Sequence, residues 1–509
     1  MSGASRRAVL DLGSNSFHLL VADVDGPEVV PVRRSREMLH LGRTLATAGR
    51  VPTAVADRAV ATVARLADLA GRTGATATVA VATAALRDPA AGDLRVRLAD
   101  AAGVPVEPLD GAEEARLAHL GARAAVAVPA EPTLVLDLGG GSLELAVGHA
   151  ERTVWATSLP LGAGRLLPGV GEGPVDAAGA AALTAAVDAA LDPVLPALRR
   201  HRPAAVIAVG GTVRALARHL AARAGRWLPA TVNMAPLPAD ELAAARDELL
   251  ATDAAGRAAL PGVKERRADH LHVAALVLAR VLARVEGPGA VVSDWGLREG
   301  VLLHRFGTPR VRDAATLRAD EVARLRRLAG GDDPHPGHVA ALAGVLFDAT
   351  APRHGLGARE RRLLTAAAEL HAVGTALALR RQQEHGAYLI EHAELRGFPP
   401  DETAMLATLV RFHPSRGISR RFPPVRALDR ADRAACDVLL GLLQVADALD
   451  AGHDQRVGLA AARLEGSTLV LAPDGGPDDA VVVRAVADRS GPLRAALGLE
   501  VVLRSRAAA

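Results

Sequence analysis

The sequence contains very little cysteine and lysine. Cys436 is the single cysteine in 509 residues, which excludes an internal disulfide. Lys264 is the single lysine, so nearly all of the 60 basic residues are arginines, and the formal net charge is +3. Arginine binds planar oxyanions through a rigid fork of donors, which suits phosphate ligands. The same bias is typical of Ala-, Arg- and Gly-rich chains from GC-rich genomes, so overall composition carries little functional weight.

Long apolar segments are also missing. The longest apolar runs, such as residues 271–282, contain His or Arg and are too short to cross a bilayer. The first strand is expected near Ala8, which leaves no room for the charged and apolar regions of a signal peptide. We therefore expect a cytoplasmic protein with no membrane partner.

One pattern occurs twice. Residues 9–19 read VLDLGSNSFHL, and residues 135–145 read VLDLGGGSLEL. Each copy predicts an apolar strand that ends in an aspartate, Asp11 or Asp137, followed by a turn of small residues and a second strand. The separation is too long for a solenoid and is typical of a duplicated domain.

Turns of this composition can bind phosphate. Glycine permits positive φ, and successive N–H groups can then form an anion-binding nest. The aspartate at the end of each strand can hold Mg²⁺ through water. Two facing turns would bind phosphate from both sides. The alternative is two ordinary β-hairpins, and the duplication favours the functional interpretation.

Other polar groups follow nearby strands. Arg87 can bind a phosphate oxygen or be a surface arginine at a helix start. Glu113 and Glu114 open a predicted helix, where they complement its dipole or one of them activates a water. Gly211 and Thr212 begin another helix and form a weak candidate anion site.

The periodicity predicts several domains. Strand and helix signals alternate from residue 7 to about 304, which predicts an α/β fold with ligand-binding loops at strand ends. Residues 315–450 read as nearly all helix. From Val457 onward the period is two, which predicts strands near 460–464, 468–472 and 480–487. The expected domains are two α/β lobes, a helical domain and a small α+β domain, over residues 1–126, 127–308, 309–455 and 456–509.

Four motifs occur in the order of a known family. They are DLGSNSFH at 11–18, GAEEARL at 111–117, DLGGGSLE at 137–144 and SDWGLREG at 293–300. With them the chain resembles the exopolyphosphatase/guanosine-pentaphosphate phosphatase (Ppx/GppA) family, in its long form. That family belongs to the sugar kinase–actin–Hsp70 superfamily, whose lobes are actin-like, or ribonuclease H-like. The resemblance continues through HGAYLI at 385–390 in the helical half.

The resemblance implies a Mg²⁺-dependent hydrolase that releases terminal phosphate from inorganic polyphosphate, or the 5′ γ-phosphate from pppGpp. It implies a homodimer and no nucleic-acid partner. Glu114 matches the catalytic base, Asp137 and Asp11 match metal-associated carboxylates, and Arg87 matches a catalytic polar group of the cleft. The phosphate-binding residues implied are Ser14, Asn15, Ser16, Gly139, Gly140, Gly141, Ser142, Glu144, Gly211 and Thr212.

The helical domain resembles the HD-type phosphohydrolase fold, which binds metal with a His, a His-Asp pair and a distant Asp. Ala372 stands where the aspartate of the pair is expected, which favours a structural domain without a working two-metal site. His338, His371 and Asp447 remain possible metal partners there.

A basic loop, residues 411–426, can hold a long anion such as polyphosphate or be a solvated surface loop.

Two other functions stay open. A superfamily kinase or ATPase would need an open purine pocket near residues 210–217, whereas filling of that region by side chains would argue against it. A non-enzymatic alarmone sensor would need a degraded site, but Asp11, Glu114 and Asp137 are present.

Overall fold

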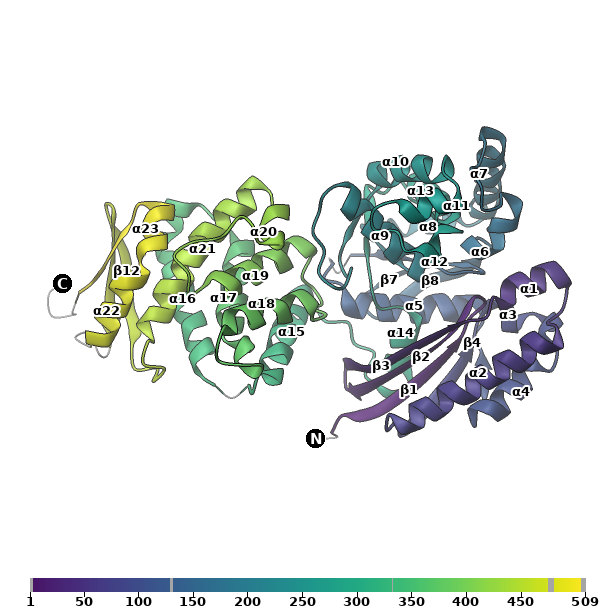
Figure 1. Ribbon diagram of the computed structural model, residues 1–509, viewed down its shortest axis with the longest axis horizontal. Coiled ribbons are helices and arrows are strands. Elements are labelled where there is room, and N and C mark those ends of the chain that lie inside the picture. Colours follow the sequence, from purple (N-terminus) through teal and green to yellow (C-terminus); the bar gives the residue numbers. More distant parts are fainter. Residues whose placement is uncertain (1–2, 129–130, 332, 475–479, 505–509) are drawn as a thin grey trace. The chain divides into compact units, whose positions relative to one another are not determined.

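The computed structural model describes residues 3–128, 131–331, 333–474 and 480–504 (Figure 1). The chain forms two compact units. The first comprises Met1–Ala224 and Val232–Ala314, and the second comprises Gly225–Thr231 and Ala315–Ala509. Within the described ranges, no helix is long and apolar enough to cross a membrane.

The first unit contains two α/β sheets of related topology. The first has the order β3-β2-β1-β4-β5, and the second has the order β10-β11-β9-β6-β7-β8. In each, an antiparallel hairpin (β1–β2 or β6–β7) is extended by a strand parallel to its first member, β4 or β9. The strands are β1 Ser5–Leu12, β2 Ser16–Asp25, β3 Glu28–Met38, β4 Ala77–Ala82, β5 Val106–Pro108, β6 Thr133–Leu138, β7 Leu143–His149, β8 Arg152–Leu159, β9 Ala205–Val209, β10 Pro236–Pro238 and β11 Gly289–Val292.

Helices cover both faces of the first sheet. Leu10 and its neighbours two residues away on β1 pack under α2 and α4, whereas Val9 points to the opposite face, under α5 and α14. The helices of this unit are α1 Leu41–Ala48, α2 Thr53–Arg72, α3 Ala84–Arg87, α4 Leu94–Ala102, α5 Gly111–Ala125, α6 Ala163–Leu166, α7 Ala177–Leu191, α8 Leu195–Arg200, α9 Gly211–Arg223, α10 Ala239–Leu250, α11 Ala254–Ala259, α12 Glu265–Ala268, α13 Leu271–Arg284 and α14 Leu297–Phe306.

The duplicated pattern predicts β1, β2, β6 and β7, whereas β3, β8 and β10 are not predicted. β3 and β8 are edge strands that extend a hairpin, and each buries only one of its residues. Three consecutive residues of β3, beginning at Val32, are exposed. An edge strand that buries so little shows no regular alternation of apolar and polar residues from which it can be recognised.

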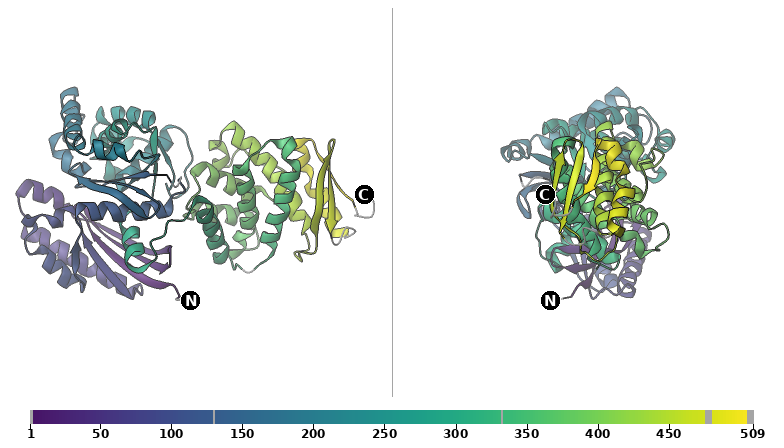
Figure 2. Two further views of the ribbon diagram at one scale, coloured as in Figure 1. Left: turned by 180° about the vertical axis from the view of Figure 1, so that it is seen from behind. Right: turned by 90° about the vertical axis from the view of Figure 1, so that its left-hand side faces the viewer.

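The second unit is mainly helical, with a three-stranded sheet of order β12-β13-β14 at its yellow end in Figure 2. Its elements are α15 Ala314–Leu328, α16 His335–His354, α17 Ala358–Leu370, α18 Gln382–His392, α19 Pro400–Phe412, α20 Pro423–Ala427, α21 Arg430–Leu449, β12 Gly458–Glu465, β13 Thr468–Asp474, α22 Ala480–Arg489, α23 Gly491–Leu497 and β14 Glu500–Leu503.

Two expectations about this unit change. The strand expected at 480–487 is wrong, because the segment is helix α22. Its buried residues Val482 and Val486 are four apart, so they share one helix face against the core. Residues 225–231, expected in the second lobe, belong to the helical unit, where Trp227 packs on the core and the Ala230 N–H donates to the Glu391 carbonyl at 2.9 Å. The four-domain division stays a prediction.

Helices α5 and α14 cross at glycines. A Cβ on Gly300 would lie 1.8 Å from the Leu117 carbonyl oxygen, and a Cβ on Gly121 would lie 2.0 Å from the Gly296 carbonyl oxygen. No side chain fits at these positions, so the two backbones are in direct contact. This contact matters for function because α5 carries Glu114 and α14 follows the SDWG segment.

We expect Gly300→Ala to destabilise the protein by about 1–3 kcal/mol or more, because the methyl group must push the two backbones apart. Gly71→Ala is the matched control: it also lies in a helix, but nothing lies within 4 Å of its added Cβ. The control should be neutral or up to about 1 kcal/mol more stable. Thermal unfolding of both variants checks this, and equal midpoints would contradict the close-packing argument.

Candidate functional site

The two repeated turns lie against each other. In each turn the first glycine N–H donates to a serine carbonyl three residues later, from Gly13 at 3.2 Å and from Gly139 at 3.0 Å. A Cβ on Gly140 would lie 2.9 Å from the Asn15 Cβ, and a Cβ on Gly141 would lie 2.8 Å from the Ser14 Oγ. The turns therefore face each other, as the repeat predicted, and glycine is required for their close approach.

Neighbouring segments fix both turns. The Ser14 carbonyl accepts from the Gly42 N–H at 2.8 Å, and the Asn15 carbonyl accepts from the Leu39 and His40 N–H groups at 3.0 Å. In the second turn, the Gly140 carbonyl accepts from the Arg165 N–H at 2.9 Å. These bonds satisfy carbonyl oxygens that would otherwise repel an anion between the turns.

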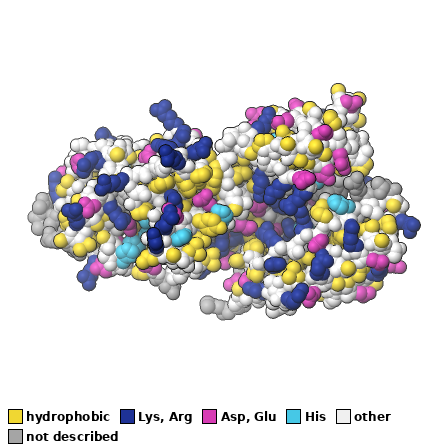
Figure 3. Space-filling view, in the orientation of Figure 1, with side chains coloured by type: hydrophobic (Ala, Val, Ile, Leu, Met, Phe, Trp, Pro, Cys, Tyr) yellow, Lys and Arg dark blue, Asp and Glu magenta, His cyan; other side chains and the backbone are white. Residues whose placement is uncertain are grey.

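A cleft of about 620 Å³ opens where the turns meet. It is lined by strand ends and turns from both sheets of this unit, and Figure 3 shows basic side chains gathered in a hollow of the unit. The sequence-predicted residues that line it are Asp11, Ser14, Asn15, Ser16, Glu114, Asp137, Gly139, Gly140, Gly141, Ser142, Glu144, Gly211 and Thr212. Of the predicted site residues, Arg87 alone is not part of the lining.

Four of these residues are carboxylates with raised pKa values. Burial is the main cause. It raises the pKa of Asp11 and of Asp137 to about 6 and the pKa of Glu114 to about 7, and it raises the pKa of Glu144 well above its usual value. Repulsion from nearby carboxylates adds to each shift, and nearby arginines oppose the shifts of the first three. The cleft thus concentrates negative charge that a cation would stabilise.

Arg87 holds Glu114. Its Nη1 donates to the Glu114 Oε2 at 2.7 Å and to the Leu109 carbonyl at 2.6 Å. The expectation that this guanidinium lines the cleft is not met, because α3 directs it to the start of α5. Arg87 therefore fixes the orientation of the Glu114 carboxylate, which is only 8% exposed.

Glu113 points elsewhere. Its carboxylate pairs with Arg116 at 2.7 Å, and both side chains are about one-third exposed. Its N–H donates to the Asp110 carboxylate, which caps α5, at 2.8 Å. Of the two adjacent glutamates, Glu114 is therefore the one in the cleft.

The sequence did not single out the arginines of the cleft. Arg36, Arg165, Arg214, Arg267 and Arg298 line it. Burial and mutual repulsion lower the pKa of Arg214 and lower the pKa of Arg267 to about 10. Arg298 lies in the SDWGLREG motif and Arg214 lies in the 210–217 region, but neither is predicted as a site residue, and the other three come from segments with no recognisable pattern. Their mutual repulsion favours binding of a polyanion.

His18 links this basic group to the first turn. Its Nδ1 lies 3.1 Å from Arg298 Nη1, and its Nε2 lies 2.8 Å from the Ser16 Oγ. Burial and the nearby arginines lower the pKa of His18 well below its usual value, so the ring is neutral. An arginine can only donate, so the ring accepts at Nδ1 and donates to Ser16 from Nε2.

The Gly210–Thr212 segment is covered by an arginine. Gly210 has φ 123°, and a Cβ there would lie 2.5 Å from the Leu138 carbonyl oxygen, so glycine is required. The Arg267 guanidinium lies 2.4 Å from the Cβ position of Gly211, and its Nη1 is 3.5 Å from the Thr212 Oγ1. A side chain therefore fills the space beside the start of α9.

The donor set of the cleft fits a hard cation. Asp11 and Asp137 end equivalent strands, β1 and β6, and both supply only carboxylate oxygens. Oxygen ligands are those that Mg²⁺ prefers. Burial disfavours the charged form of both carboxylates, and a divalent cation would stabilise that form.

Comparison with known proteins identifies the family. The model of the Ppx/GppA phosphatase family matches residues 20–308, and that of Ppx/GppA phosphatase domain III matches residues 317–464. The chain belongs to the Ppx/GppA phosphatase family. It is 32% identical to Exopolyphosphatase 1 of Mycobacterium bovis over 336 residues, which are 64% of this chain and 95% of that protein.

Solved structures agree with this assignment. An exopolyphosphatase from Cytophaga hutchinsonii matches with a TM-score of 0.54 and 27% identity, over 58% of this chain and 96% of that one. The Aquifex aeolicus Ppx/GppA protein matches with a TM-score of 0.52 and 24% identity, over 59% and 97%, and supports the fold alone. The two α/β sheets thus have the actin-like arrangement of Ppx/GppA phosphatases.

In the helical unit, the structure brings together only some of the residues that the sequence predicted as metal partners. His371 and Asp447 come together, but His338 does not join them, because its Nε2 bonds the Val457 carbonyl at 2.8 Å. His335, one helical turn earlier on α16, joins His371 and Asp447 instead.

The basic loop, residues 411–426, is partly neutralised by ion pairs. Arg411 pairs with Glu384 and Arg420 pairs with Asp437, both at 3.1 Å.

We expect Glu144→Gln to stabilise the metal-free protein at pH 8. The folded state holds the Glu144 proton more tightly than the unfolded chain does, so wild-type stability falls as pH rises above about 4.5. Glutamine removes the buried charge and can still accept from the Ser158 hydroxyl, which lies 2.8 Å from Oε1.

Thermal unfolding in metal-free buffer checks this. The gain should be present at pH 8 and should fall toward zero below pH 4.5, where both the folded and the unfolded state carry the proton. Glu286→Gln, at a glutamate whose side chain is 80% exposed, is the control and should change little. A Glu144→Gln variant less stable than the wild type at pH 8 would show that the ionised Glu144 carboxylate does not destabilise the folded protein.

Proposed function

We propose that this protein is an exopolyphosphatase, which releases terminal orthophosphate from inorganic polyphosphate by Mg²⁺-dependent attack of water in the cleft. The observation that carries the proposal is the position of Glu114. Its carboxylate, whose pKa is raised to about 7 and whose orientation Arg87 fixes, lines the same cleft as two facing glycine turns.

The turns hold the terminal phosphoryl group. Backbone N–H groups and hydroxyls of residues 14–16 and 139–142 surround it from two sides, and the satisfied carbonyls of the turns do not compete. Phosphoryl transfer needs little covalent chemistry from the protein, because positioning and charge neutralisation supply most of the catalysis. Two turns fixed by separate sheets provide that positioning.

Glu114 acts as the general base. Its pKa of about 7 lets it be ionised near neutral pH and still accept a proton from water. The water oxygen bonds to the terminal phosphorus, the bridging P–O bond breaks, and the shortened chain leaves with the electron pair. Arg87 keeps the Glu114 carboxylate in one orientation during this step.

Asp11 and Asp137 would hold the metal, which when bound neutralises charge on the phosphate oxygens. The arginines of the cleft hold the next phosphates of the chain. A substrate with one charge per phosphate relieves the mutual repulsion of Arg36, Arg214 and Arg267.

The superfamily kinase or ATPase is disfavoured by Arg267. Its guanidinium occupies the space beside Gly211 that an open purine pocket would need. Hydrolysis of pppGpp uses the same phosphate chemistry and stays an alternative, with no specific observation in its favour. The homodimer also stays a prediction.

Glu114→Gln tests the proposal. We expect phosphate release from polyphosphate to fall by about 10²–10⁴-fold, the usual contribution of a general base, while substrate binding is retained. Glu113→Gln is the matched control, because that side chain pairs with Arg116 outside the cleft. Phosphate release and polyphosphate binding are measured on both variants. Near-wild-type turnover by Glu114→Gln would overturn the assignment of the base.

Arg87→Gln should change the pH dependence. The wild-type kcat/KM should rise with pH and level off above about 7, when Glu114 is ionised. Arg87 lowers the pKa of Glu114, so its loss should move the acidic limb to higher pH and reduce activity more at pH 6 than at pH 9.

Arg116→Gln, which removes the partner of Glu113, should leave the limb in place. An equal loss at all pH values in Arg87→Gln would mean that this arginine has a structural role only.

A further inference from the structure

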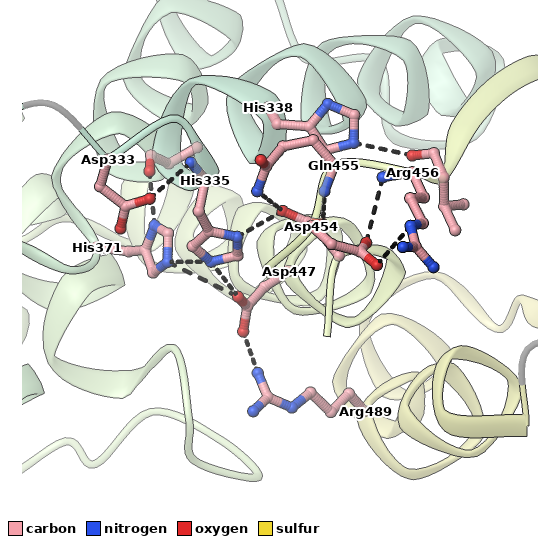
Figure 4. A network of polar contacts seen from close by, with 12 residues as sticks. Asp333, His335, His338, His371, Asp447, Asp454, Gln455, Arg456 and Arg489 are labelled. Atoms are coloured by element: carbon pink, nitrogen blue, oxygen red, sulfur yellow. Dashed lines mark hydrogen bonds and ion pairs between the residues drawn. The ribbon is translucent and has the colours of Figure 1, made fainter. Parts of the chain in front are cut away.

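The helical unit contains a second cluster of potential ligands, far along the chain from the phosphate turns. His335 begins α16, His371 follows α17, and Asp447 lies near the end of α21. All three side chains are buried and point to one another (Figure 4). The cluster therefore lies in the core of this unit, where three helices come together.

The distances within the cluster match a tetrahedral metal site. The two Nε2 atoms are 3.2 Å apart, and the Asp447 Oδ1 lies 3.3 Å from His335 Nε2 and 3.7 Å from His371 Nε2. Ligands about 2.0–2.2 Å from a tetrahedral ion are about 3.3–3.6 Å from each other. A single ion therefore fits between the three atoms with little rearrangement.

Hydrogen-bond partners outside the cluster, here called outer partners, orient the Nε2 atoms of both imidazoles toward its centre. His335 Nδ1 lies 2.7 Å from the Asp450 Oδ2, and His371 Nδ1 lies 2.6 Å from the Ala368 carbonyl. Both partners accept, so each Nδ1 carries a proton, and in the neutral ring each Nε2 then presents a lone pair to a metal ion. Asp450 is itself fixed by the Gln455 N–H at 2.9 Å. This is the usual support of a metal-binding histidine.

Three acceptor atoms thus converge in a buried space. Two Nε2 lone pairs and an anionic oxygen repel one another unless a proton or a metal ion lies between them. Asp447 offers only Oδ1, because Arg489 bonds its other oxygen. Ala372 beside His371 supplies no ligand. Among the described residues, no fourth His, Cys or carboxylate joins the group. The arrangement provides one metal position with one coordination site left for water.

We infer that His335, His371 and Asp447 bind one divalent transition-metal ion of the Zn²⁺ class in the helical unit. Two imidazoles and one carboxylate suit Zn²⁺, Co²⁺ or Ni²⁺, whereas Mg²⁺ and Ca²⁺ prefer oxygen ligands alone. The site is separate in ligands and in metal preference from the carboxylates of the cleft.

The experiment is metal binding by the full chain. The protein is stripped with a chelator and dialysed, and ZnCl₂ is then titrated by calorimetry and bound zinc is measured by elemental analysis. Co²⁺ added to the wild-type protein should give the visible absorption bands of a tetrahedral site with nitrogen ligands. We expect one tightly bound zinc per chain.

Variants locate the site. His371→Asn and Asp447→Asn should each weaken zinc binding by more than the ~10–100-fold expected for loss of an outer partner, and Asp450→Asn should weaken it by about that amount. His338→Asn is the matched control on the same helix, and Asp137→Asn tests the cleft; both should bind zinc as the wild type does.

Two results would overturn the proposal. The first is wild-type protein with no tight zinc and no tetrahedral Co²⁺ spectrum, which would mean that a shared proton holds the cluster together. The second is zinc binding that survives in His371→Asn and is lost in Asp137→Asn. Because the Co²⁺ spectrum is recorded on the wild type, misfolding of a variant does not remove the test.

Discussion

The burial of four carboxylates around one cleft is the constraint on which the first unit depends. Asp11, Glu114, Asp137 and Glu144 all carry raised pKa values, with burial as the largest cause. Burying these charges lowers the stability of the folded protein when no ligand is bound. The arrangement persists only where the surrounding structure holds the carboxylates in place. Here two sheets, two glycine turns in contact and the glycine crossing of α5 and α14 provide that support.

The opposite charge is arranged on the same cleft. Arginines that repel one another line the same cleft as carboxylates that repel one another. In the proposed function, a polyanion with a divalent cation would neutralise both sets at once. Such a charged complex would suit this cleft better than a neutral ligand.

Sequence reasoning found the turns because their chemistry is local. A strand, an aspartate and a glycine turn occupy consecutive positions, and their duplication makes the signal specific. The cleft arginines could not be found in this way, since Arg36, Arg214 and Arg267 come from three distant segments. Arg87 was found but placed wrongly, because only the fold shows that its guanidinium meets Glu114.

The helical unit shows the same limit. His335 and His338 lie one turn apart on α16, and His338 rather than His335 is predicted from the sequence as a metal partner, although no local signal separates them. The structure separates them, since His338 bonds a carbonyl of the segment before β12, whereas His335 meets His371. The valine-rich segment 480–487 is predicted as a strand, but a short apolar run does not by itself separate strand from helix, and Val482 and Val486 pack on the core from one face of a helix.

The most direct test of the central claim is phosphate release measured side by side on long-chain polyphosphate, pppGpp and ATP, with and without Mg²⁺. The account predicts rapid Mg²⁺-dependent release of orthophosphate from polyphosphate and little or none from ATP. Efficient hydrolysis of ATP, or release from polyphosphate that is unchanged when Mg²⁺ is removed, would contradict it.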